Sequence, residues 1–287
     1  EFQINTYTAD DQQFTDVTAL PDGGFVVTWT SNGQDGDSDG VYGQRFDAVG
    51  GAVGAEFQIN TFTNGQQQTP SVAAMPDGKL VVTWSSDGQD TSEHGVYGQI
   101  FDVGASSSSS NGSSSGGIAS TPQKVGSEFQ VNTYTTGDQG LPALSGPGGP
   151  NPVVSTAPNG NYLITWSSDG QDGSQLGIYG QLYATDNSKI GGEIAINQIT
   201  VSNQAHPDID FFSDGNFIIT WQTNDTSNTG IAGHIFSADG TKMGSEIAIN
   251  ATTSQAQRVP SVEVLSDDTA LITWSSYGQS GNAYDII

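Results

Sequence analysis

The sequence contains no cysteine and only six basic residues. The absence of cysteine excludes a disulfide framework and any thiolate metal site. Thirty-one acidic residues leave a formal net charge of −25. A surface this negative repels nucleic acids and anionic membranes, so neither is expected as a partner. No apolar stretch approaches the roughly 20 residues that a membrane-spanning helix needs, and membrane insertion is not expected either.

The sequence is rich instead in glycine and in one recurring phrase. Glycine accounts for 38 of the 287 residues. The five tryptophans are separated by 55, 82, 55 and 53 residues, and four of them begin copies of one loop. An internal repeat therefore organises the chain. The four copies are WTSNGQDGD (29–37), WSSDGQDTS (84–92), WSSDGQDGS (166–174) and WSSYGQSGN (274–282).

Each repeat contains four pieces that are typical of β-strands. In the first repeat the segment QFTDVTAL (13–20) precedes the turn PDGG (21–24), whose residues favour turns. The β-branched run FVVTW (25–29) follows, and after the loop come VYGQRF (41–46) and EFQINT (56–61). Four strands in about 50 residues are typical of one blade of a β-propeller.

The sequence thus predicts an all-β protein, a single domain over residues 1–287 that is a five-bladed β-propeller of four-stranded blades. EFQINT (1–6) is a spare fourth strand and the last repeat lacks one, so residues 1–6 are predicted to pair with the last blade and close the ring. A linear array of β-sandwich or solenoid repeats is the alternative. The predicted blades are 7–61, 62–133 with a Ser/Gly insertion (104–125), 134–197 with a Pro/Gly insertion (141–151), 198–250, and 251–287 plus 1–6.

The pattern of the repeat is also familiar from known proteins. The succession E-F-Q-[IV]-N-T, P-D-G-G, F-V-V-T-W, S-D-G-Q-D-G, G-V-Y-G-Q-R-F-D resembles the tandem repeats of large secreted bacterial repeats-in-toxin and adhesin-type proteins. It covers nearly the whole chain and is most specific in the first three blades. The resemblance implies an extracellular or cell-surface location and calcium, and it carries no active site. The design is also similar to five-bladed lectin propellers, an analogy of fold alone.

The repeated loops hold the first candidate ligand site. A tryptophan followed by a polar loop could stack on a sugar while the glutamine amide bonds to its hydroxyls. The competing interpretation is that each tryptophan is buried between blades. Identical weak sites on one ring would gain from multivalency. The candidate residues are Trp29, Gln34, Trp84, Gln89, Trp166, Gln171, Trp274 and Gln279.

The first loop also holds a candidate metal site. Asp35, Asp37 and Asp39 alternate in sequence and precede Gly40, as at the start of many calcium loops. The place of the last ligand is taken by Phe46 rather than by an acid, and an Asp- and Gly-rich hairpin turn is the other interpretation. Ca²⁺ is the one cofactor that the sequence suggests. If the source is eukaryotic, N-glycosylation sequons lie at Asn111, Asn224 and Asn250.

The first strands of a propeller line its central channel, and four acidic residues fall on them. Paired carboxylates are what glycoside hydrolysis needs, although a bound cation or a row of waters would use them equally. No nucleophile motif with a preceding strand and no phosphate-binding loop accompanies them. The chain is therefore predicted not to be an enzyme. The four residues of the catalytic alternative are Asp16, Asp208, Asp210 and Glu263.

Three functions follow from these observations. The leading prediction is a non-catalytic binding or adhesion module outside the cell or at its surface, which binds glycans or surface proteins and is stabilised by calcium. The alternative is a structural protomer of an extracellular filament, appendage or matrix, with copies of itself as partners. The second alternative is a glycoside-active enzyme that uses the channel carboxylates.

Overall fold

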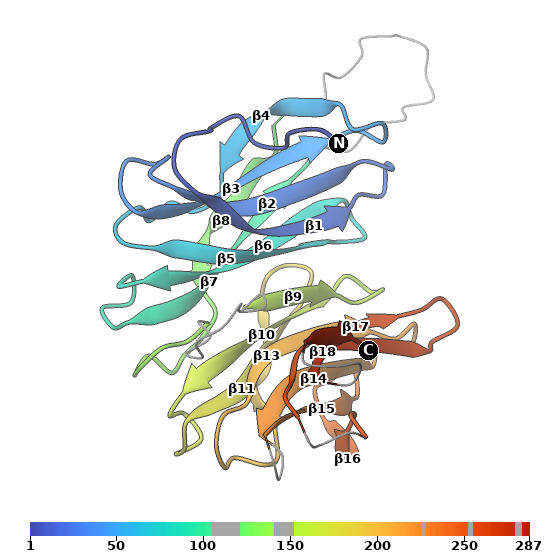
Figure 1. Ribbon diagram of the computed structural model, residues 1–287. Helices are drawn as coiled ribbons and strands as arrows, with labels where there is room; N and C mark the ends of the chain where they lie inside the picture. The colour runs from blue at the N-terminus through green and yellow to red at the C-terminus, as the bar shows by residue number, and fades with distance from the viewer. Residues whose placement is uncertain (105–120, 141–151, 225–227, 252–254, 279–282) are drawn as a thin grey trace.

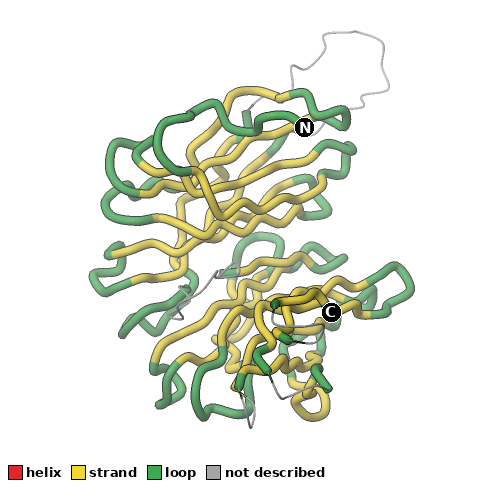
Figure 2. The backbone as a smooth tube through the Cα atoms, viewed as in Figure 1, coloured by secondary structure: helices red, strands yellow, loops and turns green. Residues whose placement is uncertain are grey.

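The computed structural model describes residues 1–104, 121–140, 152–224, 228–251, 255–278 and 283–287. Within these ranges the chain forms five antiparallel sheets, and in each sheet strands that are neighbours in sequence are neighbours in space. The sheets are arranged as blades around a common centre, and the described chain consists of strands and loops (Figures 1 and 2). The predicted five-bladed β-propeller is confirmed. None of the described residues belongs to a helix that could span a membrane.

Blades 1 to 4 have four strands each, and blade 5 has three in the described chain. The predicted insertions fall mostly on residues 105–120 and 141–151, which lie outside the described ranges. The strands are β1 (Gln12–Ala19), β2 (Phe25–Asn32), β3 (Asp39–Phe46) and β4 (Ala52–Gln58) in blade 1; β5 (Gln67–Ala74), β6 (Lys79–Asp87), β7 (His94–Asp102) and β8 (Gln123–Gln130) in blade 2; β9 (Val153–Thr156), β10 (Tyr162–Asp169), β11 (Leu176–Tyr183) and β12 (Lys189–Ala195) in blade 3; β13 (Ala205–Phe211), β14 (Phe217–Asn224), β15 (Thr229–Phe236) and β16 (Lys242–Ala248) in blade 4; and β17 (Gln257–Val264), β18 (Ala270–Tyr277) and β19 (Tyr284–Ile286) in blade 5.

The turn between the first and second strands shows why the Pro-Asp-Gly phrase recurs. In blade 1 the Gly23 N–H donates to the Leu20 carbonyl at 3.0 Å, and Gly23 has a φ of 86°. This left-handed conformation has no steric cost for glycine, and the turn therefore selects it. In blade 5 the same place is held by Asp268 at a φ of 61°. Asp is one of the few side chains that tolerate this region.

The hydrophobic core lies between adjacent blades. Phe57 and Ile59, which lie in or just beyond the fourth strand of blade 1, belong to one buried cluster with Val72 and Trp84 of blade 2. Clusters of the same kind join blades 2 and 3 and blades 3 and 4. The tryptophans at the ends of the β-branched runs are at most 2% exposed in the first four blades (Trp29, Trp84, Trp166 and Trp221).

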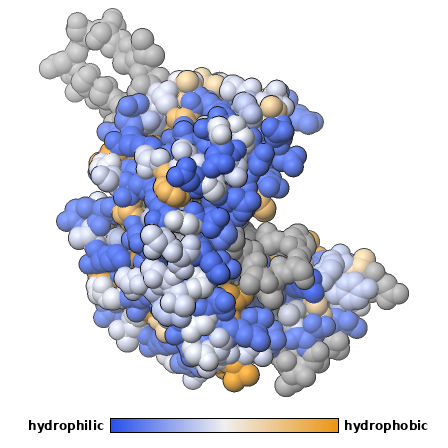
Figure 3. All heavy atoms as spheres, turned by 90° about the vertical axis from the view of Figure 1, so that its left-hand side faces the viewer, coloured by the Kyte–Doolittle hydropathy of each residue, from blue (hydrophilic) through white to orange (hydrophobic). Residues whose placement is uncertain are grey.

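The predicted closure of the ring is not what the structure shows. Residues 1–6 lie on blade 1, where the Phe2 ring contacts the Phe46 ring at 5.6 Å and the Thr6 N–H donates to the Glu56 carboxylate at 2.7 Å. Because these contacts are all made with blade 1, the segment is held without pairing to blade 5. Each of β5, β9, β13 and β17 packs on the first strand of the blade before it, whereas β1 and β17 do not pack on each other in this way. The molecule is hollowed on the side where blades 1 and 5 face one another (Figure 3). We call this gap the seam.

Candidate functional site

A central cavity of about 560 Å³ is lined by the first strands of all five blades, β1, β5, β9, β13 and β17. Its wall carries the four acidic residues that the sequence placed on the channel, which come from blades 1, 4 and 5. The structure therefore brings together carboxyl groups that are far apart in the sequence. These residues are Asp16, Asp208, Asp210 and Glu263.

Three of these carboxylates join adjacent blades. One oxygen of Asp208 accepts the Ile209 N–H at 3.0 Å, and the other accepts the Val262 N–H of blade 5 at 2.8 Å. Asp210 does the same two residues later, with the N–H of Phe211 at 2.8 Å and the N–H of Val264 at 2.6 Å. We call this arrangement a carboxylate clamp, because one side chain holds two first strands together.

Asp16 makes the same clamp between blades 1 and 2. Its oxygens accept the Val17 N–H and the Val72 N–H, both at 2.8 Å. Ser71 is the equivalent residue of blade 2, and its hydroxyl accepts the Val154 N–H of blade 3 at 3.2 Å. First-strand side chains at this position therefore bind the next blade as well as line the cavity.

Burial raises the pKa of two of the four cavity acids, Asp208 and Asp16. The pKa of Asp208 is raised to about 6, chiefly by desolvation and to a smaller extent by the nearby Asp210 charge, against the N–H bonds that lower it. Desolvation also raises the pKa of Asp16 above its ordinary value. Glu263 is exposed, and no hydrogen-bond donor contacts its carboxylate among the described residues. The cavity thus presents a buried carboxyl group that holds its proton up to about pH 6 together with a second carboxyl group that is open to solvent.

Each described bulge on the first strands has a residue in the left-handed region. The strand pairing slips at this point in blades 1, 2, 4 and 5. His206 and Val259 stand there with φ of 54° and 50°, and both line the cavity. Bulges and strained backbone often redirect side chains at functional sites. Burial and, to a smaller extent, the positive charge of Arg258 lower the pKa of His206 to about 4, so the imidazole is neutral at physiological pH.

The repeated loops are tied into the wall of the propeller. The amide of Gln171 donates to the Glu193 carboxylate at 2.7 Å, and the amides of Gln34 and Gln89 donate to Glu56 and Glu128 in the same way. The same glutamates accept the backbone N–H groups of Thr6, Thr61 and Thr133. The sequence analysis did not predict these Gln–Glu hydrogen bonds, although the loop glutamine and the glutamate that begins the fourth strand of EFQINT, EFQVNT or EIAIN recur together. Gln279 lies outside the described residues.

The tryptophans of the predicted sugar platform are not presented to solvent. Trp29, Trp84 and Trp166 are buried, and Trp274 is half-buried. A buried indole offers no ring face to a sugar, so the geometry agrees with the alternative interpretation, in which tryptophan packs between blades. These residues are therefore not part of the site that we propose below.

The three aspartates of the predicted calcium loop have separate partners. Asp39 is buried and accepts the Asn32 amide at 3.0 Å, while Asp37 accepts the Gly65 N–H at 3.0 Å. Asp35 accepts the Asp37 N–H at 3.3 Å, as in a turn. Over the described ranges, no group of three or more His, Cys, Asp or Glu side chains is arranged to hold a metal ion. Calcium binding here stays a prediction.

The sequons fall in different surroundings. Asn224 is exposed at the end of β14, whereas Asn250 is buried, with its oxygen accepting the Ile231 N–H at 2.7 Å. Asn111 lies outside the described ranges.

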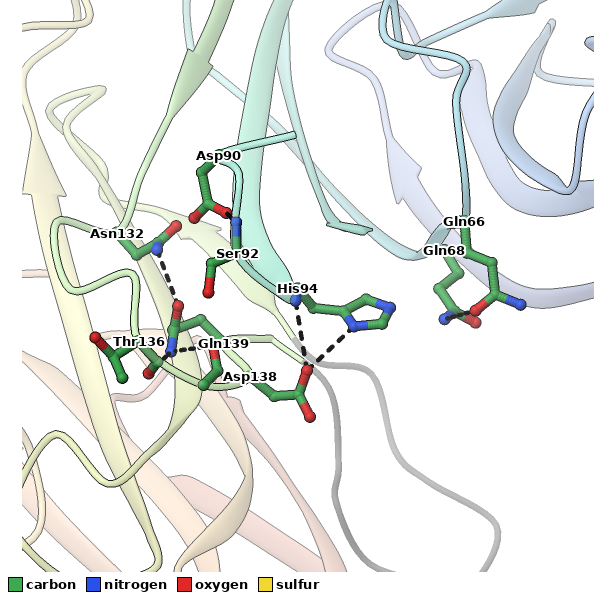
Figure 4. A network of polar contacts seen from close by, with 10 residues as sticks. Gln66, Gln68, Asp90, Ser92, His94, Asn132, Thr136, Asp138 and Gln139 are labelled. Atoms are coloured by element: carbon green, nitrogen blue, oxygen red, sulfur yellow. Dashed lines mark hydrogen bonds and ion pairs between the residues drawn. The ribbon is translucent and has the colours of Figure 1, made fainter. Parts of the chain in front are cut away.

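The rim of blade 2 carries a polar network that joins it to the start of blade 3. The His94 imidazole lies 3.2 Å from the Asp138 carboxylate, and the Asn132 amide donates to Gln139 at 3.3 Å (Figure 4). Asn and Gln recur seven residues apart in every repeat, so this half of the network could have been found in the sequence. His94 and Asp138 belong to one blade pair only.

Comparisons with known proteins bear on the fold. No family model and no curated protein matches the sequence. A thermostable family-43 glycoside hydrolase superimposes with a TM-score of 0.54 at 10% identity, over 99% of this chain and 92% of that one. An α-L-arabinanase from Penicillium chrysogenum complexed with arabinobiose gives 0.53 at 12%, over 98% and 94%. A protein of unknown function from Dyadobacter fermentans gives 0.57 at 11%, over 96% and 78%.

These likenesses show the fold, and they correct one prediction. The sequence predicts that the chain is not an enzyme, because a bound cation or a row of waters would use the channel carboxylates equally and because nucleophile and phosphate motifs are absent. The similar structures include glycoside hydrolases, whose chemistry requires carboxylic acids and no such motif. The absence of those motifs therefore does not exclude catalysis on this fold, and the prediction of a non-catalytic module is withdrawn.

Proposed function

We propose that the protein cleaves glycosidic bonds in its central cavity, with Asp208 as the general acid and Glu263 as the second carboxylate. One observation carries this proposal: a buried carboxyl group whose pKa is raised to about 6 shares a cavity with an exposed carboxylate on the adjacent strand. Glycoside hydrolysis requires two carboxyl groups, of which one delivers a proton to the glycosidic oxygen.

The chemistry assigns one step to each group. Asp208 gives its proton to the glycosidic oxygen as the bond to the anomeric carbon breaks. Glu263 either attacks that carbon, to form an ester that water then hydrolyses, or takes a proton from the water that attacks it. In the first route Asp208 regains its proton from water in the second step. The Asp210 clamp holds together β13 and β17, the two strands that carry these groups.

The substrate class follows from the same proposal. The similar structures include an arabinanase complexed with arabinobiose, so oligosaccharides of arabinan are the first substrates to test. A strongly negative protein with a formal charge of −25 is expected to prefer neutral glycans to acidic ones. An extracellular or cell-surface location, where polysaccharides occur, is part of the proposal.

The test is the release of reducing ends from a panel of neutral polysaccharides, with each variant checked for folding by circular dichroism. Glu263→Gln should reduce kcat at least about 100-fold, as expected when a group that acts in the transition state is removed. Glu93→Gln is the matched control, since Glu93 is an exposed glutamate on the rim of blade 2. Equal activity of the two variants on a substrate that the wild type cleaves would remove Glu263 from the mechanism.

A further inference from the structure

In each of blades 1 to 4 an asparagine at the equivalent position, just after the fourth strand, joins the third strand to the fourth. In blade 1 the Val41 N–H donates to the Asn60 side-chain oxygen at 2.8 Å, and the Ile59 N–H donates to the Val41 carbonyl at 2.8 Å. The other blades repeat both bonds. The N–H to asparagine bonds there join Val96 to Asn132, Ile178 to Asn197 and Ile231 to Asn250, at 2.8, 2.7 and 2.7 Å.

We call this set of hydrogen bonds between the third strand, the asparagine and the fourth strand a joint. Residues 1–6 supply the fourth strand and the asparagine of such a joint. The Asn5 amide donates to the Tyr7 carbonyl at 2.5 Å and to the Gln12 side chain at 2.9 Å, as the Asn60 amide does to Phe62 and Gln67. Among the described residues, however, no donor contacts the side-chain oxygen of Asn5. Elsewhere the fourth strand of one blade packs on the next blade in the ring. Residues 1–6 occupy that place on blade 1, as the fourth strand of a preceding blade would.

Blade 5 holds the other half. Ser275 pairs with Ile286 as Thr30 pairs with Val41, so Ile286 is the counterpart of Val41. Ile287 exchanges both backbone bonds with Trp274, at 3.0 and 3.1 Å. Because these bonds alternate along an antiparallel pair, the N–H and carbonyl of Ile286 point away from β18. Ile286 is 77% exposed, whereas Val41 is fully buried.

Apolar side chains on both sides of the seam lack the cover that the repeat gives elsewhere. Val17 on β1 is 60% exposed, whereas Val72, its counterpart in blade 2, is 5% exposed. Leu271 on β18 is 52% exposed, whereas Val26, its counterpart in blade 1, is fully buried. In each comparison the buried residue is covered by an adjacent blade, and the exposed one faces the seam.

We propose that blade 5 docks on residues 1–6 and β1 of the same chain, so that residues 1–6 become its fourth strand and the seam closes. The Ile286 N–H then donates to Asn5, and the Ile4 N–H donates to the Ile286 carbonyl. The occupant is the same chain because β1 and β17 already line one cavity. Two edges tethered in this way meet at a far higher effective concentration than two separate molecules do.

Paired cysteines test this docking in a chain that has none of its own. Tyr42 lies opposite Gln58 in blade 1, so the joint places Ile287 opposite Gln3. Directly opposite residues have Cβ atoms about 4.5–5.5 Å apart, close to the span of a disulfide. We expect mild oxidation of the Gln3→Cys/Ile287→Cys variant to give an intrachain disulfide, seen as a monomer two hydrogens lighter with no free thiol.

The yield should not change on tenfold dilution. The control is Gln3→Cys/Ile286→Cys, in which the second cysteine points to the opposite face of the strand and should stay reduced. Disulfide-linked dimers that disappear on dilution would assign the seam to a second copy. Thiols that remain as reduced as those of the control would show that the seam stays open. Either result overturns the proposal.

Discussion

The pH dependence of hydrolysis tests the role of Asp208 most directly. Its pKa is raised to about 6, chiefly because burial disfavours the charged carboxylate. A general acid must carry its proton, so kcat/KM should fall as pH rises through about 6. With that pKa about nine tenths of the molecules hold the proton at pH 5 and about one tenth at pH 7, which predicts a roughly tenfold fall in rate.

The assay is the initial rate of reducing-end release between pH 4 and pH 8 under conditions of low substrate. Asp208→Asn should lose most of the activity and leave no alkaline limb near pH 6. An alkaline limb of the wild type that lies above pH 8, or one that Asp208→Asn preserves, would refute the assignment.

The same proton also links stability to pH. A carboxyl whose pKa is higher in the folded than in the unfolded protein stabilises the fold at low pH, and this contribution is lost as pH rises from about 4 to about 6. Two pH units correspond to about 3 kcal/mol of the free energy of unfolding. His206 acts in the opposite sense, because its pKa is lowered to about 4 and its protonation in acid favours unfolding. The Asp208 contribution is therefore read from the difference between wild type and Asp208→Asn.

Two further predictions concern the wall of the propeller. Asp16→Ala leaves the N–H groups of Val17 and Val72 without their acceptor, and should lower the free energy of unfolding at pH 7 by about 2–4 kcal/mol in urea titrations. A loss below about 0.5 kcal/mol would contradict the clamp. Trp166→Ala should lower it by about 3–5 kcal/mol through the cavity it creates, while the folded variant keeps its KM for glycans. Unchanged stability with a raised KM would indicate instead that Trp166 contacts the glycan.

The sequence was sufficient to predict the fold because each repeat contains recognisable patterns for its own strands and turns. The Pro-Asp-Gly turn, the β-branched run and the terminal tryptophan each have a local physical reason, and their period gives the blade. The acids of the cavity could also be predicted, since Asp16 and Asp208 occupy equivalent first-strand positions. The carboxylate clamp could not, because it depends on which backbone N–H group of the next blade lies within reach.

The candidate ligand residues of the repeated loops show where the sequence leaves two interpretations open. A repeated polar loop with a repeated aromatic, such as Gln34 and Trp29, is typical of lectins and equally of packing between blades. Which role such a residue has depends on its contacts with the neighbouring blade. These contacts cannot be predicted from the sequence of the repeat that contains the residue. The same holds for residues 1–6, whose pattern fits the fourth strand of blade 5 and also fits the face of blade 1 on which they lie.

The free carboxylate of Glu263 has its explanation in the seam. Thr18 of blade 1 and Asp210 of blade 4 occupy the same first-strand position, and both accept an N–H from the next blade, from Ala74 at 3.2 Å and from Val264 at 2.6 Å. The next blade for Glu263 is blade 1, which lies across the seam. If the ring closes, the repeat directs one Glu263 oxygen towards the N–H of Ala19. Its second oxygen then remains for the substrate, held in a defined position as Asp208 is held by its own clamp. Closure of the ring would thus orient the second carboxylate rather than remove it from the cavity.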